Sequence, residues 1–182
     1  MTKDRTEFGW MSEVIGVTAD NPKKVRGFRS HRLFFEEAGS NPTLQTSWTQ
    51  GEALVTRGGK KTGTRFGWGT GGDSGSALAG LAELFNNPQT HGILPCYHNF
   101  TPSGEYALTG FFIPAYRMHF GYLDDRGCTN EVLAKEHFEK NRELKRTNPK
   151  AFLEYASEYC FTPEDALIRQ GENQFNQAAL AE

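Results

Sequence analysis

Cysteine is scarce in this 182-residue sequence, and the scarcity excludes one class of small protein. The three cysteines are Cys96, Cys128 and Cys160, an odd count that does not fit a disulfide scaffold. Their rarity predicts a reducing compartment. Long hydrophobic runs are also missing, and the first ten residues, MTKDRTEFGW, lack the apolar core of a signal peptide. We therefore expect neither secretion nor insertion in a membrane.

A strong charge of either sign is missing too. The net charge of −2 neither favours nor excludes a polyanionic partner. Its distribution is less even, because residues 1–66 hold 11 Lys and Arg against 7 Asp and Glu, whereas residues 67–182 hold 9 against 15. Local charge governs attraction to phosphate. The positive segment is also the one that carries the nucleotide-type motifs described below.

The composition is otherwise that of an ordinary folded protein, with 37% apolar and 23% charged residues. Its length suits one domain, or one domain with an appendage. In the first half, alternating patterns predict strands at residues 13–19, 32–36 and 62–68, and helices at 42–56 and 76–85. Strands that alternate with helices predict an α/β domain with a largely parallel sheet.

The second half changes character. Residues 92–117 contain short β-type runs, and residues 131–147 predict a charged helix with Glu131–Lys135 and Glu136–Lys140 at favourable spacing. Thr162-Pro163-Glu164-Asp165 is a strong helix start. We therefore expect a short β region followed by a helical C-terminal segment.

Two adjacent acids follow an apolar run in Leu33–Gly39 (LFFEEAG). Nucleotide hydrolysis needs an acid that holds a metal ion and a second group that orients water. A buried strand would hold Glu36 and Glu37 at the carboxyl edge of a parallel sheet, where ligands bind. The alternative is a strand followed by two solvated carboxylates, and the spelling alone does not separate the two.

Two further segments have nucleotide-type chemistry. Arg26, in VRGFR, lies ten residues before the acids, and an arginine can stabilise charge on a transferring phosphoryl group. Alone, it is better explained as part of a basic surface turn. The turn GTGGD, residues 69–73, follows a predicted strand, and its Thr70 could sense a γ-phosphate. The alternative for its glycines is a loop that needs positive φ.

The order and spacing of these segments resemble the large terminase subunits that package the DNA of tailed phages. The resemblance is carried by VRGFRSHRLFFEEAGSNP, FGWGTGGDSG, GFFIPAYR and EYCFTPEDAL…NQFN, and it runs from about Val14 to Asn176. It implies an ATPase domain of the P-loop NTPase fold, of the additional-strand type with a catalytic glutamate. It also implies ATP and Mg²⁺ as cofactors.

The resemblance implies a role for each site residue. Glu36 would bind Mg²⁺ in the Walker B motif, and Glu37 would be the catalytic glutamate. Arg26 would act on the nucleotide of a neighbouring subunit. Gly69, Thr70 and Gly71 would form the coupling motif at the nucleotide. Residues 1–127 would be the second part of the ATPase domain, and residues 128–182 the linker toward a nuclease domain.

The implied partners are double-stranded DNA, a portal protein, the small terminase subunit and further copies in a ring, expected to be a pentamer. The implied location is the host cytoplasm, at the procapsid portal.

The sequence departs from the family pattern at three points. Glu36 stands where an Asp is usual, and Arg32 lies within the otherwise apolar strand. The phosphate loop GxxxxGK[ST] is also missing, and GTGGDSGS, residues 69–76, cannot replace it because it has no lysine. The resemblance therefore implies a fragment, which by itself is expected to be inactive.

Four alternative functions compete with the motor. Gly72-Asp73-Ser74-Gly75 spells a serine-protease motif, but no histidine has a matching context and a helix is predicted next. Cys96 and His98 could bind a metal, but no second ligand pair is evident. Residues 140–150 could contact DNA, although interleaved acids favour a solvated helix face. Finally, the chain could be a non-catalytic module that docks on the portal or on intact motor subunits.

Overall fold

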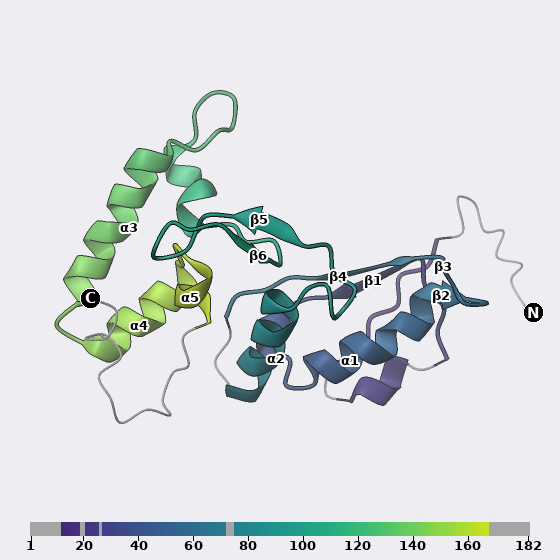
Figure 1. Ribbon diagram of the computed structural model, residues 1–182. Helices are drawn as coiled ribbons and strands as arrows, with labels where there is room; N and C mark the ends of the chain where they lie inside the picture. Colours follow the sequence, from purple (N-terminus) through teal and green to yellow (C-terminus); the bar gives the residue numbers. More distant parts are fainter. Residues whose placement is uncertain (1–11, 19–20, 26, 72–74, 168–182) are drawn as a thin grey trace, which may run out of the picture.

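The computed structural model describes residues 12–18, 21–25, 27–71 and 75–167 (Figure 1). The first half contains η1 (Pro22–Val25), β1 (Arg32–Phe35), η2 (Ala38–Ser40), α1 (Leu44–Gly51), η3 (Glu52–Val55), β2 (Thr56–Arg57), β3 (Lys60–Lys61), β4 (Thr64–Gly67) and α2 (Gly75–Asn86), where η marks a 3₁₀ helix. The second half contains β5 (Cys96–His98), β6 (Ala107–Thr109), η4 (Ala115–Arg117), η5 (Phe120–Tyr122), α3 (Glu131–Lys145), α4 (Pro149–Glu158) and α5 (Pro163–Ala166).

The centre of the first half is a parallel pair of strands, β1 and β4, in the register Arg32↔Thr64 to Phe35↔Gly67. Both strands were predicted, and the mixed α/β class is confirmed. The expected larger parallel sheet is not seen, because the described residues form three two-stranded sheets, of which β2–β3 and β5–β6 are antiparallel.

Helices α1 and α2 cover one face of the parallel pair (Figure 1). The core between them contains Phe35, Leu44, Trp48 and Leu84, all at most 9% exposed. The Trp48 indole N–H donates to the carbonyl of His91 at 2.9 Å, so its polar group is satisfied inside the core. This packing fixes the positions of the strand ends.

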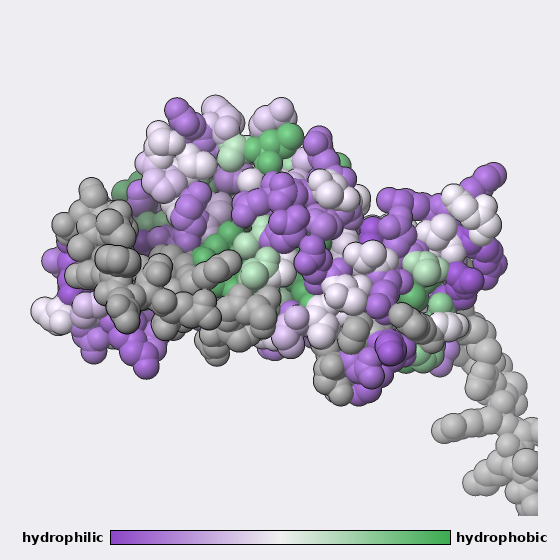
Figure 2. Space-filling view, turned by 60° about the horizontal axis from the view of Figure 1, so that its bottom comes forward, coloured by the Kyte–Doolittle hydropathy of each residue, from purple (hydrophilic) through white to green (hydrophobic). Residues whose placement is uncertain are grey.

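Among the described residues, the opposite face of the pair is only partly covered. Phe34, Phe66 and Trp68 lie there with 54%, 42% and 49% of their surface exposed, and the Phe34 ring packs on the other two. Parallel sheets are normally covered on both faces. Figure 2 brings forward the other side, on which α1 and α2 lie, and shows apolar side chains interrupting an otherwise hydrophilic surface there. In the described part of the chain, the parallel pair is therefore covered by helices on one face and about half exposed on the other.

Three elements of the structure differ from the prediction. Residues 13–19 were predicted as a strand, but Ser12–Thr18 has no strand partner among the described residues and its side chains are exposed. Alternation alone was misleading there. The first helix begins at Leu44 rather than at Pro42, because the Asn41 side chain accepts from the Thr43 amide at 2.9 Å and stabilises a turn ahead of it. Helix α4 was not predicted.

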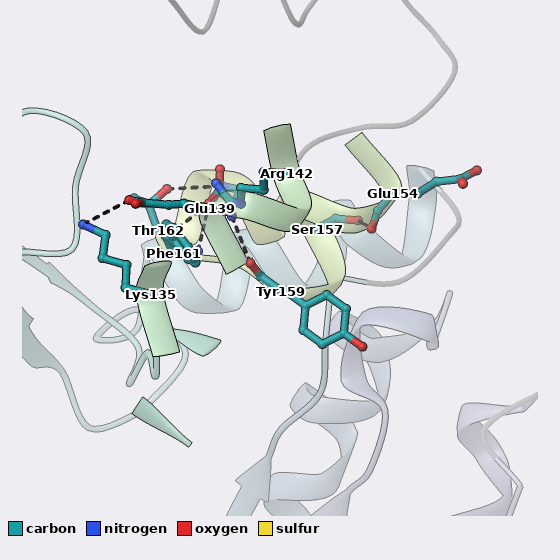
Figure 3. Close-up of polar contacts among 9 residues, drawn as sticks. Lys135, Glu139, Arg142, Glu154, Ser157, Tyr159, Phe161 and Thr162 are labelled. Carbon is teal, nitrogen blue, oxygen red and sulfur yellow. Dashed lines mark hydrogen bonds and ion pairs between the residues drawn. The ribbon is translucent and has the colours of Figure 1, made fainter. Parts of the chain in front are cut away.

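The C-terminal helices pack around one ion pair (Figure 3). Arg142 of α3 donates to the Asp165 carboxylate at 2.8 Å and to the Tyr159 carbonyl at 2.9 Å. The guanidinium also lies 3.9 Å from the centre of the Phe161 ring. Thr162 and Asp165 form a capping box at the start of α5, which confirms the predicted helix start. Within the part of the chain described here, no helix combines the length and the apolar character that crossing a membrane requires.

Candidate functional site

The acid pair forms a bulge at the carboxyl end of β1. The Trp68 amide donates to the Phe35 carbonyl at 3.1 Å, and the Ala38 amide donates to the Trp68 carbonyl at 3.0 Å. In a regular parallel ladder the second donor would be residue 37, so one extra residue is inserted here. Glu36 and Glu37 are the bulged residues, and both are exposed. Bulges often redirect side chains beside active sites.

Glu37 has a left-handed backbone, with φ 48° and ψ 47°, and is the single non-glycine residue with positive φ among those described. This conformation costs an L-residue other than Asn or Asp about 1–2 kcal/mol. A hydrogen bond holds this conformation in place, because the Ser40 amide donates to the Glu37 carbonyl at 2.8 Å. A strained residue fixed by its surroundings is a reason to look for function at that position.

The turn that follows β4 packs directly against this bulge. A Cβ added to Gly69 would lie 2.7 Å from the Ala38 nitrogen, and one added to Gly39 would lie 1.9 Å from the Thr70 carbonyl oxygen. The two backbones therefore touch with no space for a side chain. Neither Gly69 nor Gly71 has positive φ. Close approach, rather than left-handed geometry, explains why glycine is needed here.

On its other side the turn meets the C-terminal helices. A Cβ added to Gly71 would lie 1.7 Å from the carbonyl oxygen of Ala166 in α5. Gly69–Gly71 thus lies between the acid bulge and α5, with Gly71 buried and Gly69 and Thr70 exposed. Neither Gly39 nor Ala166 was predicted as part of the site. Gly39 had a signal, a glycine two residues after the acid pair, whereas nothing in the sequence pointed to Ala166.

The structure brings together Glu36, Glu37, Gly69, Thr70 and Gly71 at the carboxyl ends of two neighbouring parallel strands. Arg26 lies outside the described residues, as do Asp73 and Ser74 of the GDSG sequence. For that sequence the structure shows only that helix α2 begins at Gly75, as predicted.

The exposed carboxylates suit a metal ion better than they suit a nucleotide. Mg²⁺ usually takes one or two carboxylates and completes its shell with water and phosphate oxygens, so Glu36 and Glu37 fit part of such a shell. No group of three possible metal ligands occurs within the described segments. Residues 1–182 contain no phosphate loop, so the chain does not supply a cradle for ATP phosphates.

A separate hollow of about 330 Å³ lies among η4, η5, α3 and the end of α4. Its lining is mostly apolar, with Ile113, Met118 and Phe120 at its surface, and it also includes His119 and Tyr159. It shares no residue with the acid bulge. It contains no lysine or arginine to hold phosphate, so it is no substitute for the missing cradle.

The Cys96–His98 pair has a structural explanation. Both ring nitrogens of His98 are engaged, one with the Thr109 hydroxyl at 2.8 Å and the other with the Phe100 amide at 3.2 Å. His98 is 8% exposed and stacks on Phe100. The histidine therefore joins β5 to β6 and has no free nitrogen for a metal.

Comparison of the chain with protein-family models, with curated proteins and with solved structures found no match.

Proposed function

We propose that this chain is part of the ATP-hydrolysing motor of a terminase large subunit, which moves double-stranded DNA into a procapsid. One observation carries the proposal. Two exposed acids form a strained bulge at the end of a parallel strand, and the turn after the neighbouring strand packs against it. Carboxyl ends of parallel strands are where α/β proteins bind ligands.

In this proposal the two acids have separate tasks. Glu36 holds Mg²⁺, and Glu37 orients the water that attacks the γ-phosphate. Bound Mg²⁺ neutralises charge on the phosphates. Adjacent residues of an extended chain point to opposite sides, and the left-handed Glu37 turns its side chain again. Thr70 then faces the γ-phosphate, and Arg26 serves the nucleotide of the next subunit in a ring.

The proposal requires a complementary polypeptide. The P-loop NTPase fold would be complete only when that polypeptide adds the phosphate loop, with its backbone amides and its lysine. The half-exposed Phe34, Phe66 and Trp68 would then pack under the added layer. Alone, the chain presents two negative charges to ATP with no cation in a phosphate loop to offset them. We therefore expect calorimetric titration of the isolated chain with ATP and Mg²⁺ to detect no tight binding. Micromolar binding would contradict the proposal.

The decisive experiment adds the phosphate-loop half of a terminase large subunit and measures phosphate release. We expect Glu37→Gln to lower turnover by about 10²–10⁴-fold, as loss of a water-orienting base does, while ATP binding is kept. Glu13→Gln, which removes an exposed acid outside the strands, is the matched control and keeps turnover. Wild-type turnover in the Glu37→Gln motor would refute the assigned role.

Arg26 needs a test of its own, in mixed rings. If it acts on the neighbouring nucleotide, Arg26→Ala subunits bind ATP but inhibit rings that also contain wild-type subunits. A loss of about 10³-fold in all-variant rings fits such a residue. Activity simply proportional to the wild-type content would count against it.

The half-exposed aromatic face favours a second function, a non-catalytic module that docks on the portal or on intact motor subunits. Three rings about half exposed leave roughly 300 Å² of apolar surface open. A standard interface takes about 800 Å² per partner, so the face alone is too small for a stable dimer and suits a layer of a larger partner. Phe34→Ser would abolish docking in this case, whereas Glu37→Gln would leave docking unchanged.

A further inference from the structure

The strands β2 and β3 form a short hairpin, Thr56–Lys61, that projects at one end of the molecule (Figure 1). Its turn is Gly58-Gly59, with φ of 56° and 75°. Positive φ at both central residues is typical of the tight turn whose twist matches the paired strands. The hairpin is therefore a defined projection and not an irregular loop.

Hydrogen bonds fix the base of this hairpin. The Arg29 guanidinium donates to the carbonyls of Ala53 at 2.6 Å and Thr56 at 2.9 Å. From the other strand, the amides of Thr62 and Gly63 donate to the Val55 carbonyl at 2.8 and 3.1 Å. Because both strands are held where they leave the body, the direction of the hairpin is set before any ligand binds.

The hairpin carries three exposed cations with no acidic partner. Arg57 lies directly opposite Lys60, and Lys61 lies opposite Thr56. None of the three cations has an ion pair among the described residues. Like charges in directly opposed positions destabilise a strand pair. The protein therefore maintains a local repulsion that an external anion would relieve.

These cations cannot serve the acid site. They precede the amino end of β4, whereas Glu36 and Glu37 follow the carboxyl end of β1, its parallel partner. Four residues of strand at about 3.3 Å each separate the two ends by about 13 Å. The hairpin is thus not the missing phosphate cradle, and its anion must be another one.

We propose that the β2–β3 hairpin contacts the phosphate backbone of double-stranded DNA. Residues 56–64, TRGGKKTGT, contain no aromatic side chain on which an unpaired base could stack. Contacts by Arg57, Lys60 and Lys61 would therefore depend on phosphate charge and not on base sequence. Double-stranded DNA has the higher density of phosphate charge, so it is the favoured partner. The inference deepens the proposed function, on which the choice of DNA as the polyanion rests.

The test measures binding of the full chain to a duplex of mixed sequence as salt is varied. Each phosphate contact contributes about −0.9 to the slope of log K against log salt. The variant Arg57→Gln/Lys60→Gln/Lys61→Gln is expected to lose about 2.7 from that slope. Between 50 and 200 mM salt, wild-type affinity should accordingly fall about 40-fold more than variant affinity.

The matched control is Lys23→Gln/Arg126→Gln/Lys135→Gln, which removes the same charge from exposed positions outside the hairpin and outside residues 140–150. We expect its slope to stay close to the wild-type slope. A control that loses as much as the hairpin variant would overturn the inference. So would a wild-type chain that prefers single-stranded DNA, or a hairpin variant that loses binding to phosphatidylserine vesicles but not to the duplex.

Charge reversal separates folding from binding. Arg57→Glu puts opposite charges across the strands, so its melting temperature should equal or exceed that of wild type while duplex binding weakens. If melting temperature and binding fall together, the cations are structural and the inference fails. A motor that hydrolyses ATP in the complementation assay but shows no hairpin effect would refute this inference and leave the proposed function intact. Duplex binding through the hairpin without any ATP hydrolysis would support this inference and contradict the proposed function.

Discussion

Replacing Glu37 with glycine should remove backbone strain that the chain stores at the acid bulge. The left-handed conformation of Glu37, φ 48°, costs about 1–2 kcal/mol for an L-residue and almost nothing for glycine. Glycine also loses more chain entropy on folding, by about 0.5–1 kcal/mol. The net effect of Glu37→Gly is therefore neutral to stabilising by about 1 kcal/mol.

The neighbouring acid provides a control that cancels the entropy. Glu36 is also exposed and bulged, but its φ is not positive. Glu36→Gly therefore loses the same entropy and the same charge without relief of strain. The two variants should differ by about 1–2 kcal/mol, with Glu37→Gly the more stable. For a domain of this size that difference corresponds to roughly 2–8 °C in melting temperature.

Urea unfolding followed by tryptophan fluorescence measures both variants, at protein concentrations low enough to prevent self-association. Glu37→Asn is a second variant, because asparagine tolerates the left-handed region better than glutamate does. It should exceed Glu36→Asn in stability. Equal stabilities within about 0.5 kcal/mol in both comparisons would show that no strain is stored at residue 37, and would remove the observation on which the proposed function rests.

Three further results are expected. Gly39→Ala and Gly69→Ala should each destabilise the protein by about 1–3 kcal/mol or more, since the added carbon would meet backbone atoms at 1.9 and 2.7 Å. Gly16→Ala, which adds its carbon in open space, should be neutral in the same urea assay. Equal effects of the three substitutions would contradict the close approach of the two backbones. Asp165→Asn should lower the free energy of unfolding by about 2 kcal/mol, because it breaks the 2.8 Å ion pair with Arg142. Glu154→Gln, which breaks an exposed ion pair at 3.7 Å, should change thermal stability by less than about 0.5 kcal/mol. Similar losses in the two variants would contradict the expected difference between the two ion pairs. Burial, reinforced by Asp165, raises the pKa of the Cys160 thiol to about 11. Iodoacetamide at pH 8 should therefore modify the exposed Cys128 before Cys160, as mass spectrometry of samples taken over time would show. Equal modification rates of the two cysteines in the folded protein would contradict this expectation.

The raised Cys160 pKa also determines how stability depends on high pH. The unfolded thiol ionises near its ordinary pKa of 9.0, while the folded thiol stays protonated up to about 11. Ionisation therefore favours the unfolded chain between these values, and stability falls as pH rises through that window. Cys160→Ala should lose this part of the pH dependence.

Strand periodicity and helix-start signals predicted most of the elements but not all of them. The strand β1 was predictable because the apolar run Leu33–Phe35 ends at two acids, and β4 because Thr64–Gly67 leads into the glycine-rich turn GTGGD. Residues 13–19 showed similar alternation, but Ser12–Thr18 forms no strand, because alternation does not supply a hydrogen-bonding partner. Helix α4 was missed although Asn148-Pro149 provides the same cap-and-proline signal as Thr162-Pro163.

The structure brings the predicted acids and the predicted turn residues Gly69–Gly71 together, but the geometry of this arrangement was not predictable. The sequence Glu36-Glu37 is the same whether the pair ends a regular strand or forms a bulge. The left-handed backbone of Glu37 could therefore not be predicted from the sequence. The contact between Gly71 and Ala166 joins residues 95 positions apart, and no local pattern encodes such a contact. The sequence did predict which acids matter if this is a nucleotide site, since their place after an apolar strand is a local property.

Two sets of unpartnered charge, at opposite ends of one parallel strand pair, limit what this chain can do alone. The acids at the carboxyl end repel a nucleotide unless cations are brought to them, and the hairpin cations at the amino end cannot reach them. A single small anion therefore cannot satisfy both sets. Both sets would be satisfied by a partner that supplies a positive phosphate cradle at one end and by a separate polyanion at the other. A motor that hydrolyses nucleotide at one place while it holds DNA at another has this arrangement. Phosphate-loop complementation and duplex binding should accordingly be separable, so that Glu37→Gln leaves the salt slope unchanged and the hairpin variant leaves single-turnover hydrolysis unchanged. Strong mutual interference between the two sets of variants would show that the ends are not independent.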